Sequence, residues 1–137
     1  MSYKFGKTSL ERLSTCDDRL QNLFMIAISR SPVDFGIAEG HRTIARQKKL
    51  YDEGKSKIDG VTRKGKHNYS PSQAVDVYAW VNGKASWDKK HLILIAGVVL
   101  ACAKEARIDI RWGGNWDGDG EIISDQNFID LPHYELI

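Results

Sequence analysis

Residues 66–80 read KHNYSPSQAVDVYAW, and the rest of the chain can be interpreted outward from this stretch. Residues 73–80 have the composition of a β-strand, and alternation puts Val75 and Val77 on one face of it. Asp76 falls between them on the opposite face. A carboxylate inside an apolar strand is costly unless it is paired or bound to a metal ion, so Asp76 indicates a polar site beside this strand.

A second group of polar residues lies in the C-terminal stretch DLPHYELI, residues 130–137. His67, Asp76 and His133 offer two imidazoles and one carboxylate, and three such ligands with a fourth position for water are typical of a catalytic zinc site. Asp130 could then move the proton of that water. Each histidine also has a simpler interpretation, as a surface residue at His67 and a hydrogen-bonded core residue at His133. Spacing alone leaves these alternatives open.

Hydrophobic periodicity and chain-breaking residues predict the outline of the fold. Helical spacing of apolar residues favours four helices, and alternation favours four short strands. We expect helices at 8–13, 17–29, 43–53 and 87–107, strands at 33–39, 73–80, 108–112 and 134–137, and irregular loops at 55–72 and 113–127. Few strands interspersed with helices predict an α+β class, with a small, mainly antiparallel sheet and flanking helices in a single domain spanning residues 1–137.

Composition argues against several classes of protein. Apolar residues make up 42% of the 137 residues and charged residues 28%, as in a globular domain. The net charge of +2 is too small to argue for a nucleic-acid partner. The longest apolar run, 92–102, is too short to cross a membrane, and the N-terminus has no apolar signal region. We therefore expect a soluble chain made in the cytosol, with Cys16 and Cys102 as buried free thiols.

Four separated motifs resemble one known family. His67 followed by Ala74-Val75-Asp76, with Asp130-x-x-His133 near the C-terminus, resembles zinc peptidases that include bacterial D-Ala-D-Ala carboxypeptidases and dipeptidases, whose fold the hedgehog signalling domain shares. The runs GHRTIARQ at 40–47 and WGGNW at 112–116 resemble further motifs of the same family. The most similar branch is the phage L-alanyl-D-glutamate endopeptidases, which act as endolysins. Gly65 departs from the serine of the family pattern, and the loop between His67 and Asp76 is slightly long.

The resemblance implies a zinc peptidase that hydrolyses the bond between L-Ala and D-Glu in bacterial peptidoglycan and so lyses the host. His67, Asp76 and His133 would hold Zn²⁺, and Asp130 would be the general base. We expect such an enzyme to be made in the host cytoplasm, to reach the periplasm through a separate pore-forming protein, and to act as a monomer.

The resemblance also implies roles around the zinc. Arg42 would lie beside it as a fixed positive charge that binds a substrate carboxylate or the developing oxyanion. Gln47 would support Arg42 in substrate binding. Glu135 shares a strand face with His133 by alternation, and it is either a hydrogen-bond partner of that histidine or a surface carboxylate.

The loop after residue 113 resembles the opening of an EF-hand. Asn115, Asp117 and Asp119 place oxygen side chains at its first, third and fifth positions, and Glu121 follows. Gln126 stands at the twelfth position, where a bidentate glutamate belongs. The sequence therefore predicts either a weak Ca²⁺ site that orders the loop before Asp130, or an acidic turn.

Three alternatives to the endopeptidase remain. The first is a D,D-carboxypeptidase or dipeptidase of the same family. The second is a binding protein that keeps the fold and the zinc without catalysis, against which the presence of both Asp130 and Arg42 argues. The third is a nucleic-acid binder that uses the basic loop at 55–66, which the low net charge and the absence of interleaved aromatic residues disfavour.

Overall fold

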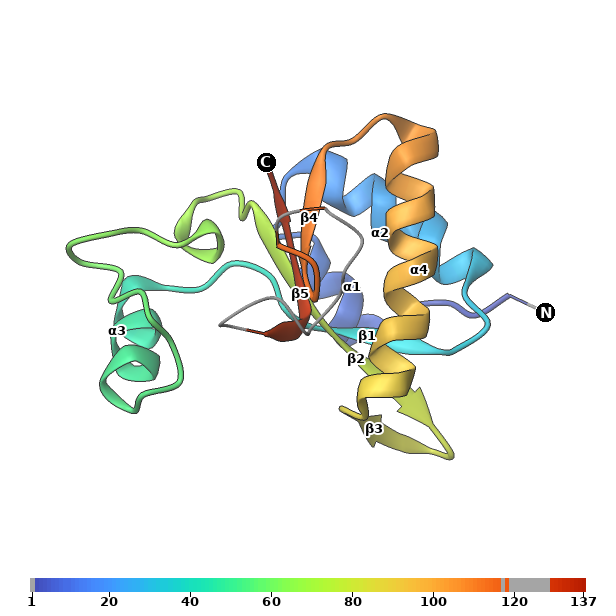
Figure 1. The fold of residues 1–137 in the computed structure, drawn as a ribbon, viewed down its shortest axis with the longest axis horizontal. Coiled ribbons are helices and arrows are strands. Elements are labelled where there is room, and N and C mark those ends of the chain that lie inside the picture. Colours follow the sequence, from blue (N-terminus) through green and yellow to red (C-terminus); the bar gives the residue numbers. More distant parts are fainter. Residues whose placement is uncertain (1, 117, 119–128) are drawn as a thin grey trace.

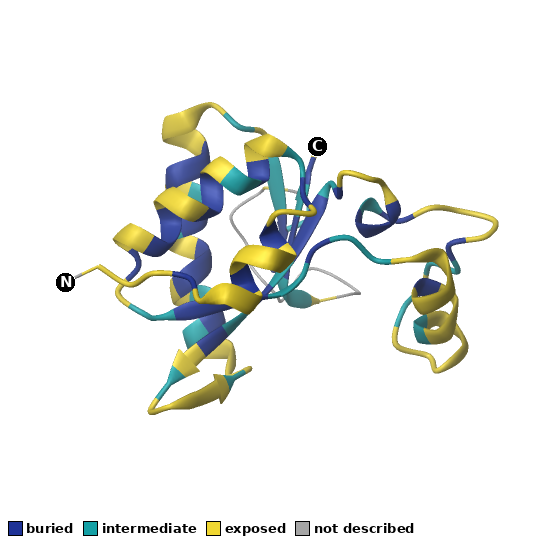
Figure 2. Cartoon of the chain, turned by 180° about the vertical axis from the view of Figure 1, so that it is seen from behind, coloured by how far each residue is buried: buried dark blue, intermediate teal, exposed yellow. Residues whose placement is uncertain are grey.

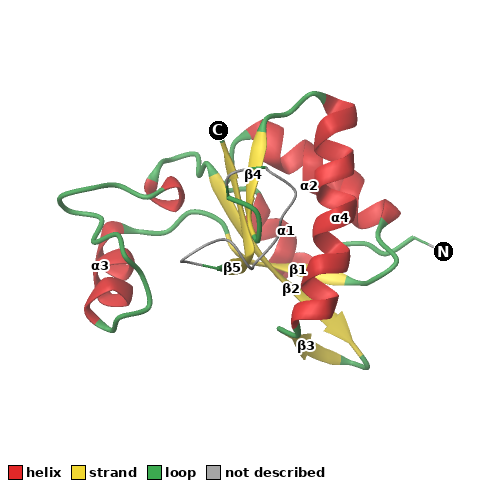
Figure 3. Ribbon diagram, viewed as in Figure 1, coloured by secondary structure: helices red, strands yellow, loops and turns green. Residues whose placement is uncertain are grey.

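The computed structural model describes residues 2–116, 118 and 129–137 (Figure 1). The helices are α1 (Lys7–Leu13), α2 (Asp18–Arg30), α3 (Ile44–Asp52) and α4 (Lys89–Ala106), with a 3₁₀ turn, η1, at Lys66–Asn68. The strands are β1 (Phe35–Glu39), β2 (Ala74–Val81), β3 (Lys84–Ser86), β4 (Ile110–Gly113) and β5 (Asp130–Leu136). Helices and strands are interspersed along the chain, which confirms the expected α+β class (Figure 3).

The strands form one antiparallel sheet in the order β1-β2-β5-β4, and β3 pairs with β2. The register of β2 and β5 places Asp76 directly opposite His133. Side chains that are directly opposite across an antiparallel pair lie about 4.5–5.5 Å apart at Cβ. The sheet therefore brings together two polar residues that are 57 positions apart in the chain.

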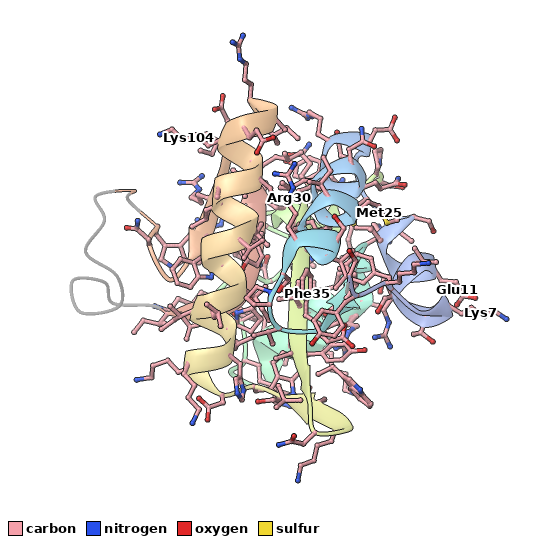
Figure 4. All side chains as sticks on the ribbon, turned by 90° about the vertical axis from the view of Figure 1, so that its right-hand side faces the viewer. Lys7, Glu11, Met25, Arg30, Phe35 and Lys104 are labelled. Carbon is pink, nitrogen blue, oxygen red and sulfur yellow. The ribbon has the colours of Figure 1, made fainter. Side chains whose placement is uncertain are left out.

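Helices α2 and α4 lie side by side against the sheet (Figures 1 and 4). The buried stripe of α2 consists of Leu20, Leu23, Phe24, Ala27 and Ile28, because residues at three- and four-residue spacing share one helix face. Phe24 packs edge-on against the fully buried Tyr134 of β5, with 5.4 Å between ring centres. This packing holds in place the strand that carries His133.

Helix α3 and the loop that follows it project away from α2 and α4 (Figures 1 and 3). We call residues 44–66 the arm. Most of its residues are exposed (Figure 2), whereas Gln47 is buried. The arm holds eight basic and three acidic residues, a net charge of +5, against +2 for the whole chain. Thr43 caps α3 by accepting the backbone N–H of Arg46, as its position predicts.

Two strands differ from the expected pattern. The sequence did not predict β3, because its three residues have no apolar alternation; it forms by pairing with β2 across the turn at Asn82-Gly83, where both residues have positive φ. Strand β5 begins at Asp130, well before the strand expected at 134–137, because it pairs with both β2 and β4. Among the described residues, no helix is long and apolar enough to cross a lipid bilayer.

Candidate metal centre

His67 is buried in η1, and one of its two ring nitrogens makes a hydrogen bond. Its Nδ1 lies 2.7 Å from the carbonyl oxygen of Gly40, and because a carbonyl oxygen only accepts, this nitrogen carries the proton. Nε2 is then the lone-pair nitrogen. It is buried with no hydrogen-bond partner in the described part of the chain, and Asp76 Oδ1 lies 3.2 Å away outside hydrogen-bonding geometry. A buried, unshared imidazole lone pair beside a carboxylate fits a metal ligand.

His133 approaches the same carboxylate from β5. Its Nδ1 lies 3.0 Å from Asp76 Oδ1, and its Nε2 lies 2.8 Å from Glu135 Oε1. Burial would lower the pKa of His133, but the hydrogen bonds to Asp76 and Glu135 outweigh burial and raise this pKa to about 10. Glu135 holds the proton on Nε2, which leaves Nδ1 to face Asp76. The strand alternation that places Glu135 beside His133 was predicted from the sequence.

The ligand atoms of His67, Asp76 and His133 all lie within 4.8 Å of one another. Ligand atoms around a tetrahedral zinc ion with bonds of about 2.0–2.1 Å lie about 3.3 Å apart. The distances from Asp76 Oδ1 to the two histidine nitrogens, 3.2 and 3.0 Å, are close to this value. Two nitrogens and one oxygen also suit zinc. The fold therefore brings together the three expected ligands in an arrangement that fits such an ion.

Arg42 orients Asp76. The Arg42 Nη2 atom lies 3.3 Å from Asp76 Oδ2, so Oδ1 is the oxygen that faces the histidines. Burial would raise the pKa of Asp76, but the neighbouring imidazoles of His67 and His133 and the hydrogen bond from His133 hold it well below its usual range. Asp76 is therefore ionised, as a metal ligand must be.

The guanidinium of Arg42 is itself almost fully engaged. Glu39 binds it with both oxygens, at 2.9 and 2.8 Å, and Gln47 Oε1 lies 3.0 Å from Nη1. Together with Asp76 these partners use four of the five N–H donors of an arginine. No pattern in the sequence pointed to Glu39, which belongs to none of the motifs. Only the fold shows that this acid anchors the arginine.

Gln47 connects the arm to this network. Its Oε1 accepts from Arg42, and its Nε2 donates to Ser56 Oγ and to the carbonyl oxygen of Ile58, both at 2.8 Å. Asn68 of η1 donates to the backbone carbonyl of Arg42 at 3.0 Å. Gln47 therefore touches Arg42, and a direct part in substrate binding stays a prediction.

Asp130 lies at the start of β5 and lines the same cavity as the candidate ligands. Burial and the negative charge of Asp76 raise the pKa of Asp130. Its backbone pairs with Gly113, where a Cβ atom would overlap the carbonyl oxygen of Asp130, so this close approach requires glycine. A carboxyl group with a raised pKa is suited to take up and return a proton.

A cavity of about 950 Å³ opens beside these residues. On the sheet side it is lined by residues of β1, β2 and β5, and on the arm side by residues of α3 and the following loop. Trp116 packs near His133, with ring centres 5.5 Å apart, and also lines the cavity. The candidate ligands and Asp130 thus face a space large enough for a short peptide.

The predicted calcium ligands Asp117, Asp119 and Glu121 lie outside the described residues. Asn115 is described, and its backbone N–H donates to the carbonyl oxygen of Trp112 at 3.0 Å. Calcium binding by this loop stays a prediction.

Known proteins resemble this chain over its whole length. The family model for phage L-alanyl-D-glutamate peptidases matches residues 1–137. The L-alanyl-D-glutamate peptidase of Escherichia phage T5 is 31% identical over 140 residues, with 100% of both chains covered. The crystal structure of the L-Ala D-Glu endopeptidase ChiX of Serratia marcescens has a TM-score of 0.80 and 30% sequence identity, and the match covers 98% of this chain and 90% of that one.

Proposed function

The chain belongs to the phage L-alanyl-D-glutamate peptidase family, and on that basis we propose that it is a zinc-dependent endopeptidase that cuts between L-Ala and D-Glu in cell-wall peptides. The observation that carries the proposal is the group of His67, Asp76 and His133, whose ligand atoms lie within 4.8 Å. Asp130 lines the same cavity. A metal-binding group with a spare acid beside it suits hydrolysis of an amide bond.

Each residue has a role that follows from its contacts. His67, Asp76 and His133 would hold zinc, which when bound lowers the pKa of a water molecule to about 7 and polarises the scissile carbonyl. Asp130 accepts the proton of the attacking water and returns it to the leaving amine. Arg42 keeps Asp76 in position, and its one remaining N–H can donate to the developing oxyanion.

Two measurements on the purified protein test this proposal. Metal analysis is expected to find about one zinc ion per chain, in line with a single three-ligand site. Digestion of purified peptidoglycan is expected to create new amino termini on D-Glu. New termini on D-Ala instead would support a D,D-peptidase, and zinc binding without any cleavage would support a non-catalytic binding protein.

The proposal extends to the place of action. The enzyme is made in the host cytoplasm, reaches the peptidoglycan through a separate pore-forming protein, and acts as a monomer; the phage family supports this proposal. Expression of the chain alone is expected to leave a culture turbid, and co-expression with a pore-forming protein is expected to clear it. Sedimentation should give a mass near 15.5 kDa.

Calcium control is a separate part of the proposal, and the sequence at 115–121 supports it. Chelation of calcium with zinc still bound is expected to lower activity, and replacement of both Asp117 and Asp119 by alanine is expected to remove the response. If a calcium-selective chelator does not change activity, and no calcium binds at millimolar concentration, the loop is an ordinary acidic turn.

A further inference from the structure

The cavity beside the metal centre has walls of opposite charge. Among the described residues, the acids that line it all come from strands: Glu39, Asp76, Asp130 and Glu135. Most of the basic residues that line it come from the arm: Arg46, Lys55, Lys57, Arg63 and Lys66. The arm has a net charge of +5, so the remainder of the chain has −3. A cationic wall thus faces the strands that carry Asp76 and His133.

Two of these cations have no carboxylate within ion-pair distance in the described part of the chain. Arg46 pairs with Glu39 at 3.0 Å, and Lys55 lies 3.9 Å from Glu53. Arg63 and Lys66 have no such partner. Lys66 is half-buried as a residue, and its ammonium lies 3.3 Å from the neutral side-chain oxygen of Gln73. The charge of Lys66 also lowers the pKa of Glu135. Because its hydrogen bond is to a neutral amide, the ammonium can still gain from a direct anionic partner.

Lys66 is also the cation nearest in sequence to the metal centre. It directly precedes His67 in the 3₁₀ turn η1, so one short rigid element presents both the ligand and the ammonium to the cavity. Arg63 lies on a turn that Asp59 closes, since Asp59 Oδ1 accepts the backbone N–H groups of Val61 and Thr62, both at 2.9 Å. Both cations are therefore carried by ordered backbone.

The proposed substrate presents an anion at a matching place. A glutamate whose amine forms the scissile amide has two carboxyl groups, and one of them continues the peptide. The other is free and lies within a few bonds of the scissile nitrogen. Arg42 is not available as a two-pronged partner for this carboxylate, because four of its N–H donors are engaged.

We infer that Lys66, assisted by Arg63, forms the subsite that binds the free carboxylate of the glutamate on the leaving side of the scissile bond. The inference rests on the proposed function and identifies the free carboxylate as the group of the substrate that this subsite recognises. With the scissile carbonyl over His67, Asp76 and His133, the leaving residue extends toward the arm, and its carboxylate meets the cationic wall.

Two synthetic peptides that differ in one group test the inference. One contains L-Ala-D-Glu with the free carboxylate, and the other carries a primary amide in its place. For the wild-type protein, kcat/KM is expected to be about 10- to 100-fold lower on the amide, as is typical of one lost charge-assisted hydrogen bond. Lys66→Met should cause a similar loss on the carboxylate peptide and less than about a threefold change on the amide.

Three further variants serve as controls. Lys66→Arg keeps the charge and should restore part of the loss. Arg63→Met should show the same selectivity to a smaller degree, and it is farther in sequence from the ligand His67. Lys49→Met removes the same charge from an exposed position of the arm that does not line the cavity, and it should leave both peptides unaffected. Zinc content and Tm are measured for every variant.

The outcomes separate the two proposals. If the wild-type protein cleaves both peptides equally, or if Lys66→Met and Arg63→Met each slow both peptides by the same factor with zinc retained, the carboxylate subsite is wrong and the endopeptidase stands. If the wild-type protein with zinc bound cleaves neither peptide, the proposed function itself fails and the subsite falls with it.

Discussion

The guanidinium of Arg42 makes planar contacts to Glu39, Gln47 and Asp76 at once, which the point charge of a lysine cannot reproduce. We expect Arg42→Lys to recover little of what Arg42→Ala loses, with zinc affinity reduced by roughly 10- to 100-fold in both, as is usual when a residue that orients a metal ligand is changed. Competition with a chromogenic chelator measures the affinity.

Arg19→Lys is a matched control, because Arg19 also pairs with a carboxylate, Asp17, but on the surface. It should leave zinc affinity unchanged. Equal zinc affinity and activity in Arg42→Lys and the wild-type protein would contradict an orienting role for the planar group.

Asp130 should be separable from metal binding. Asp130→Asn keeps the size of the side chain but cannot accept the water proton, so turnover is expected to fall by roughly two to four orders of magnitude. Zinc content and Tm should stay near those of the wild-type protein, because Asp130 is not one of the three candidate ligands. The exposed Asp109→Asn is the control. Near-normal wall digestion by Asp130→Asn would assign the base to another group.

Among individual residues, the sequence predicted the candidate ligands and the candidate base better than the residues that hold them in position. His67, Asp76, His133 and Asp130 were predicted from residue type and motif order, and the fold places all four on one cavity. Glu39 was not predicted, because its role depends on the path of the chain between β1 and α3. The number of Arg42 donors that the described residues engage could not be predicted either, since it is a property of the tertiary structure.

Gly40 directly follows strand β1 and packs closely against the C-terminal end of α1. A Cβ atom at Gly40 would lie 2.5 Å from the carbonyl oxygen of Arg12 and 2.5 Å from Thr15 Oγ1. The carbonyl oxygen of Gly40 also holds Nδ1 of His67. We expect Gly40→Ala to lower the free energy of unfolding by about 1–3 kcal/mol, as for overpacking, and to weaken zinc binding by moving His67.

Gly97 of α4 provides the comparison, because a Cβ atom there meets nothing within 4 Å. Gly97→Ala should be neutral or stabilise by about 0.5–1 kcal/mol, since alanine favours a helix. Urea unfolding and zinc titration of both variants check the expectation. Zinc affinity unchanged in Gly40→Ala would show that the Gly40 carbonyl does not fix His67.

Some helices and strands could be predicted from the local sequence, and others could not. Strand β2 followed from the alternation around Val75 and Val77, and α2 followed from its apolar stripe, because each pattern reports burial of one face. Strand β3 and the first residues of β5 exist because a partner strand is available, and no local pattern encodes that. The arm was predicted as a helix followed by a long loop. The hydrogen bonds of Gln47 to Ser56 and Ile58, which hold that loop against α3, were not predicted.

Across the whole molecule, a metal ion at this centre would join β2 to β5, whose facing ligands are 57 positions apart. A ligand that binds only the folded state stabilises it, by about 2.7 kcal/mol at a free concentration of 100 times Kd. We expect a zinc chelator to lower Tm by about 5–10 °C at such a zinc excess. Thermal unfolding with and without chelator measures this, and added zinc should restore Tm. A Tm that does not respond would contradict zinc binding at this centre.

The ring of His133 lies between the carboxylates of Asp76 and Glu135, so each nitrogen faces an acceptor. With a pKa of about 10, the ring carries both protons at neutral pH in the metal-free protein. Zinc must displace the proton on Nδ1, so about one proton should be released for each zinc bound at pH 7; calorimetry in buffers of different ionisation enthalpy counts it. The metal centre therefore exchanges one cation for another. A proton occupies Nδ1 of His133 until zinc replaces it, so acid competes directly with zinc.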